Sequence, residues 1–121
     1  MNKLYDYVIN NQNENTVIIP RSCLRLCKGD YNLAAVLMEL ITYSYIYKDE
    51  DNFFWIKNEE FGLSLDLTVD QVKYSIKKIK KILGGSLTTY KKKIDGVPVV
   101  HYRFDEDEII KLIKNLEFRR R

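Results

Sequence analysis

The sequence predicts one α+β domain, and three observations carry that prediction. Residues 68–83 place their apolar side chains at helical spacing, and Gly84-Gly85 follows at once. Two β-favouring segments, 86–94 and 97–104, flank Asp95-Gly96, a strong signal for a two-residue hairpin. Helical patterns lie on both sides of this pair, and 121 residues suffice for one core without metal or disulfides.

The N-terminal segment is weakly patterned. Residues 4–9 permit a short helix, and the polar run from Asn10 to Asn15 favours a loop, so residues 1–15 are taken as an N-terminal arm and 16–121 as the domain. Thr16 to Ile19 is β-branched and stops at Pro20. Because proline cannot donate to a sheet ladder, we expect a short edge strand there.

The next segments predict the core. Residues 21–28 suit one or two helical turns that Gly29 ends, and Asp30 or Asn32 can cap the following helix. Apolar residues are dense from 32 to 47, which predicts a long helix buried on most of its circumference. The polar residues 49–52 then break the pattern, and the aromatic segment 53–56 predicts a second short strand.

Two helices joined by a tight turn follow. Residues 58–65 predict a helix of about two turns with Asn58 as its cap, and Asp66-Leu67 forms the connection. Thr68 caps the helix that runs to Leu83, and Gln71 three residues later completes a capping-box pattern. The segment therefore predicts helix, turn and helix.

A type I′ turn at Asp95-Gly96 would fix the register of the hairpin. It pairs Ile94 with Val97, Lys92 with Val99, Tyr90 with His101, and Leu87 with Phe104. Strand alternation then puts these residues on the core face: Leu87, Thr89, Val100, Tyr102 and Phe104. The opposite face receives Thr88, Tyr90, Lys92, Val99, His101 and Arg103. A last helix begins with the acids 105–108 and ends with the arginines 119–121, as the helix dipole favours.

This order of elements is that of a winged helix-turn-helix with a small antiparallel sheet and a C-terminal helix. Over roughly residues 16–113 the chain also resembles the N-terminal domain of DnaD-like and replisome-organiser replication initiators of phages, plasmids and Gram-positive bacteria. The segments that carry the resemblance are Ile18–Pro20, Asn32–Leu37, Phe54–Lys57, Leu67–Val72, Ile79–Ile82 and Val100–Phe104. The resemblance implies a phage or mobile-element protein that binds DNA and self-associates through its N-terminal strand and helix.

Charge is strongly segregated along the chain. Residues 68–93 carry eight Lys and Arg against one acid, although the whole chain has a net charge of only +3. A local field of that sign attracts phosphate through counterion release. On an isolated helix a solvated lysine face would be the simpler explanation. The adjacent lysines of the hairpin favour a nucleic-acid surface instead.

We therefore expect the helix 68–83 to enter the major groove of double-stranded DNA. Gln71 and Tyr74 are the candidates for base contacts, although the capping box competes for Gln71. The candidate phosphate contacts are Lys73, Lys77, Lys78 and Lys81 on the helix and Lys91, Lys92 and Lys93 on the wing.

Other classes of function were weighed against this one. The cationic face would also suit an acidic host protein or a ribonucleoprotein, as in a phage-encoded inhibitor or adaptor of a host defence complex. Catalysis is not expected, because acid-base or nucleophilic chemistry needs convergent groups and the only histidine, His101, sits in a predicted strand opposite Tyr90. Cys23 and Cys27 are predicted to be reduced structural thiols, and no cofactor or metal site is expected.

Location and assembly can also be anticipated. The start of the chain has no signal-peptide pattern and no apolar run is long enough to cross a bilayer, so we expect a cytoplasmic protein. The many aromatic residues exceed what a small core absorbs, which favours a homodimer.

Overall fold

The computed structural model describes residues 3–10 and 16–119, with side chains through residue 117. The predicted loop residues 11–15 and the last two arginines, 120 and 121, lie outside the described residues. The elements in chain order are α1 Lys3–Asn10, α2 Arg21–Leu26, α3 Tyr31–Tyr47, β1 Phe54–Trp55, α4 Asn58–Leu65, α5 Val69–Leu83, a 3-10 turn Gly84–Ser86, β2 Leu87–Ile94, β3 Val97–Phe104 and α6 Glu106–Arg119. This is the predicted winged helix-turn-helix.

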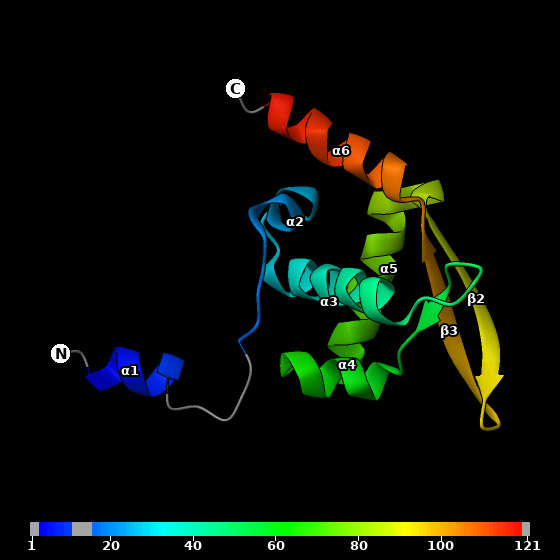
Figure 1. The fold of residues 1–121 in the computed structure, drawn as a ribbon, viewed down its shortest axis with the longest axis horizontal. Helices are drawn as coiled ribbons and strands as arrows, with labels where there is room; N and C mark the ends of the chain where they lie inside the picture. Colours follow the sequence, from blue (N-terminus) through cyan, green and yellow to red (C-terminus); the bar gives the residue numbers. More distant parts are fainter. Residues whose placement is uncertain (1–2, 11–15, 120–121) are drawn as a thin grey trace.

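Helix α3 is the centre of the core. The Asp30 carboxylate accepts the Leu33 N–H at 3.1 Å, which confirms Asp30 as the N-terminal cap. Helices α2, α4 and α5 surround α3, and the sheet closes the remaining side (Figure 1). Leu37 and Leu40 of α3 are almost wholly buried, together with Phe54 and Phe61 from β1 and α4.

The sheet is antiparallel with strand order β1-β3-β2. The predicted hairpin register is confirmed from Leu87 opposite Phe104 to Ile94 opposite Val97. Asp95 and Gly96 have φ of 52° and 81°, as a type I′ turn requires. Strand β1 adds two residues to the other edge of β3, where Trp55 pairs with His101.

The turn between α4 and α5 depends on a close backbone approach. A Cβ built on Gly62 would lie 2.6 Å from the carbonyl oxygen of Leu67, so only glycine fits there without a backbone shift. The Leu67 N–H donates to the Gly62 carbonyl at 2.9 Å, and Asp66 takes the left-handed conformation with φ of 55°. The capping box is confirmed, because the Gln71 N–H donates to Thr68 Oγ1 and the Thr68 N–H donates to Gln71 Oε1.

Two sequence predictions were wrong. Residues 16–20 form no strand, because β1 and β2 are the two edges of the sheet and neither pairs with this segment. The N-terminal cap of α4 is Lys57 without a side-chain cap bond, and Asn58 is the first helical residue. Val99 and His101 lie on the predicted face opposite the core and are nevertheless buried.

The N-terminal helix α1 confirms the short helix allowed by residues 4–9. None of its side chains is buried, and Leu4, Val8 and Ile9 are at least half exposed. Within the described ranges, no helix has the length and apolar character needed to cross a bilayer.

Candidate nucleic-acid interface

Helix α5 presents two cationic stripes on its exposed side. The buried stripe contains Val72, Ser75, Ile76, Ile79 and Leu83. At about 100° per residue, one exposed stripe contains Lys73, Lys77 and Lys80 and faces the wing, while the second contains Tyr74, Lys78 and Lys81 and faces away from it. Helix α5 is therefore oriented as its amphipathic pattern predicted, with its apolar stripe in the core and its lysines exposed.

The first stripe lines a groove of about 480 Å³ between α5, β3 and the start of α4. Lys73, Lys77 and Lys80 approach the groove from α5, Lys57 from the residue before α4, and Lys91 from β2. Its apolar floor includes Ile56, Ile76 and Tyr102. Three separate parts of the chain thus bring ammonium groups to one concave surface.

The wing lysines do not all share this surface. Lys91 lies opposite Val100 and shares the inner face of the hairpin, and Lys93, two residues nearer to the tip, shares that face. Lys92 lies opposite Val99 on the outer face. Lys91 and Lys93 therefore share a face that Lys92 does not, because successive strand residues point to opposite faces.

The two candidate base-reading side chains already have intramolecular partners. Gln71 Oε1 accepts the Thr68 N–H at 2.9 Å, which leaves only its amide N–H groups for another ligand. The Lys78 ammonium lies 5.0 Å from the ring centroid of Tyr74, and a hydrogen bond to Tyr74 raises the pKa of Lys78. Both residues are exposed, but each takes part in local structure.

Two residues of the groove were missing from the sequence-based set. Lys80 lies about 40° around the helix from Ile76, next to the buried stripe. A residue in that position borders any groove beside the helix, so helical spacing could have identified it. Lys57 carries no local signal, because only the fold brings the end of β1 beside α5.

The lysines of the groove are not neutralised by close acids. Among the described side chains, ion pairs within 4 Å join only Lys48 to Glu106 and Lys111 to Glu108. Glu59 is the one acid that lines the groove, against five lysines. The surface therefore keeps a positive excess available for an anionic ligand.

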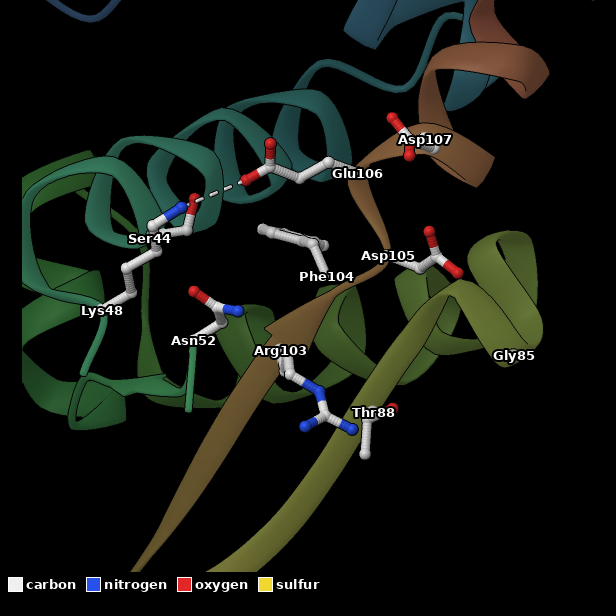
Figure 2. Close-up of a pocket in the computed structure, with 10 residues that line it drawn as sticks. All are labelled: Ser44, Lys48, Asn52, Gly85, Thr88, Arg103, Phe104, Asp105, Glu106 and Asp107. Carbon is white, nitrogen blue, oxygen red and sulfur yellow. Dashed lines mark hydrogen bonds and ion pairs between the residues drawn. The ribbon is translucent and has the colours of Figure 1, made fainter. Parts of the chain in front are cut away.

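A second hollow has a different character. It lies beside the start of α6, and Figure 2 shows Lys48 reaching across it to Glu106, with Asp105 and Asp107 nearby. The Lys48–Glu106 separation is 3.4 Å. Acidic and basic groups are mixed here, so the hollow lacks the consistent sign of charge that the α5 groove has.

The thiols and the histidine have structural surroundings. Cys23 and Cys27 are buried and unpaired, and burial raises the pKa of Cys27 to about 12, so its thiol stays protonated. His101 Nδ1 donates to the Val99 carbonyl oxygen at 3.1 Å. Within the described part of the chain, His, Cys, Asp and Glu form no group of three that could hold a metal ion.

Comparison with known proteins adds no relative. No family model, no curated protein and no solved structure matches this chain.

Proposed function

We propose that this chain is a DNA-binding winged-helix protein of a phage or mobile element, without enzymatic activity and acting in the cytoplasm. The observation that supports this best is the convergence of Lys57, Lys73, Lys77, Lys80 and Lys91 on one groove. The resemblance of residues 16–113 to replication-initiator domains points to the same class of ligand.

Helix α5 would enter the major groove while the inner face of the wing follows the flanking backbone. Lysines contact phosphates as point charges and carry no sequence information. Because Gln71 is held in the capping box and Tyr74 lies against Lys78, direct base contacts contribute little. The binding mode is therefore mainly electrostatic, with weak sequence preference and a steep dependence on salt.

Charge reversal in the groove tests this function. Lys77→Glu with Lys80→Glu removes two phosphate contacts, which should weaken binding to a duplex by about tenfold or more and reduce the salt slope by about 1.8. Fluorescence anisotropy with a labelled duplex at several salt concentrations measures both quantities.

The matched control is Lys3→Glu with Lys114→Glu, which changes the net charge equally at exposed sites on α1 and α6. The control variant should retain most of the affinity for the duplex. Its two substitutions lie outside the groove and leave the five groove lysines in place. Equal weakening by both pairs would contradict the groove as the binding site.

A protein partner is the second candidate function. It is favoured by exposed apolar residues that do not line the groove, namely Tyr45, Ile46 and Tyr47 at the end of α3. An acidic host protein or a ribonucleoprotein bound there and on α5 would explain both surfaces, and a second copy of the chain would explain the apolar one. Binding that persists at high salt distinguishes protein recognition from phosphate binding.

A further inference from the structure

The outer face of the three-stranded sheet carries a continuous row of stacked side chains. The Arg103 guanidinium lies 4.5 Å from the ring of Phe53, and Phe53 meets Tyr90 edge to face at 4.8 Å. Tyr90 stacks on His101 at 4.9 Å, and the Trp55 ring lies 6.2 Å beyond His101. The row crosses all three strands, with Phe53 placed one residue before β1.

Among the described residues no helix covers this face, and Phe53 packs onto it from the segment before β1. In Figure 1 the helices lie on the inner side of the sheet, and none of the described helices lies against its outer side. Trp55 and Tyr90 are therefore 37% and 40% exposed, whereas His101 between them is 5% exposed. The buried histidine fixes the two neighbouring rings in place, so they are ordered before any ligand arrives.

Two cationic side chains share this face with the row. Arg103 lies at one end, and Lys92 occupies the same face toward the hairpin tip. On β3 the positions that carry Arg103 and pair with Lys92 are four residues apart, which is about 13 Å along a strand. The acids Glu50 and Asp51 precede Phe53 in the chain, and Arg103 also lines the hollow that holds Asp105, Glu106 and Asp107.

We propose that this outer face, formed by Phe53, Trp55, Tyr90, His101 and Arg103, binds single-stranded nucleic acid by stacking unpaired bases. Exposed, ordered rings on a sheet with flanking cations are the features that stacking of unpaired bases uses. A duplex does not suit this mode of binding, because its base faces are covered by neighbouring pairs. The site is separate from the α5 groove and goes beyond the function proposed above.

Trp55 is the only tryptophan in the chain, so its fluorescence reports on this face directly. Titration with an oligothymidylate of about ten nucleotides should quench the emission of Trp55 in a saturable manner. An oligonucleotide of equal length made of abasic sites keeps the phosphates but lacks bases, and should quench little. Equal quenching by the abasic strand, or by a blunt duplex, would overturn the proposal.

Two substitutions at Tyr90 distinguish loss of the stacking ring from loss of the hydroxyl group alone. Tyr90→Ala should weaken binding of the oligothymidylate by about 5- to 150-fold, the range for loss of one stacked ring. Tyr90→Phe keeps the ring and should retain the affinity even though it removes the hydroxyl. The control Tyr45→Ala removes an exposed tyrosine from the end of α3 and should have no effect. Unchanged affinity in folded Tyr90→Ala would reject the site.

The proposal for the α5 groove and the proposal for the outer face can be tested independently. The pair Lys77→Glu and Lys80→Glu should lose duplex affinity but keep the quenching of Trp55 by single strands. If the emission of Trp55 instead shifts with protein concentration in the absence of nucleic acid, the face is an interface between two copies of the chain and the proposal is wrong.

Discussion

The two faces of the wing are built from the same strands but are ordered in different ways. On the inner face Tyr102 stacks on Phe54 at 5.6 Å, and the hydrophobic core covers both rings. On the outer face Tyr90 stacks on His101 at 4.9 Å, and side chains of the same face, including Phe53, provide the cover. Figure 2 shows the change of face within one step of β3, where Phe104 and Arg103 point to opposite sides.

Alternation along a strand determines which face of the sheet a side chain occupies. It does not determine whether that side chain is buried. The inner face is buried because helices pack on it, so its order depends on the whole fold. The outer face gains its order from cross-strand ring contacts, each of which contributes a smaller free energy. Substitutions in the inner face should therefore affect stability, and substitutions in the outer face should affect binding.

The largest contrast is expected between two adjacent residues of β1. Phe54→Ala removes a ring that is 1% exposed and leaves a cavity, so the free energy of unfolding should fall by about 3–5 kcal/mol. Trp55→Ala removes a ring from the opposite face, and about 1 kcal/mol should be lost. Urea unfolding followed by circular dichroism measures both. Equal losses would mean that the outer face is part of the folding core.

A pH titration should give the next largest effect. Burial raises the pKa of the Tyr102 hydroxyl above its usual value of about 10. Above pH 10 the unfolded chain releases a proton that the folded chain retains, so rising pH favours unfolding. Between pH 9 and pH 11 the wild type should lose about 1.4 kcal/mol more than Tyr102→Phe. Parallel stability curves for the two proteins would contradict this.

The smallest effect is expected for the same substitution near neutral pH. The Tyr102 hydroxyl is buried and has no hydrogen-bond partner among the described residues. Removing it should stabilise the fold by about 1 kcal/mol, since the desolvation cost of the group disappears. Tyr90→Phe on the outer face is the matched control, and thermal unfolding should show it to be nearly neutral because the Tyr90 side chain remains in contact with water.

Sequence patterns predicted the helices, the hairpin register and the capping box because each depends on residues close in the chain. Thr68 and Gln71 are three positions apart, and Asp95-Gly96 alone fixes the pairing of β2 with β3. The predicted strand at residues 16–19 failed for the opposite reason. Pairing needs a free sheet edge, and local β-branching says nothing about where that edge lies.

The residues of the candidate sites also fall into two groups, those that the local sequence could identify and those that only the fold brings together. Helical spacing alone assigned Lys77 and Lys78 to an exposed cationic side of α5, because that spacing follows from backbone geometry. The inclusion of Lys57 in the groove and the burial of His101 beneath rings from two other strands depend on segments distant in the chain. Folding decides which of these segments meet, since packing of the core sets the distance between them.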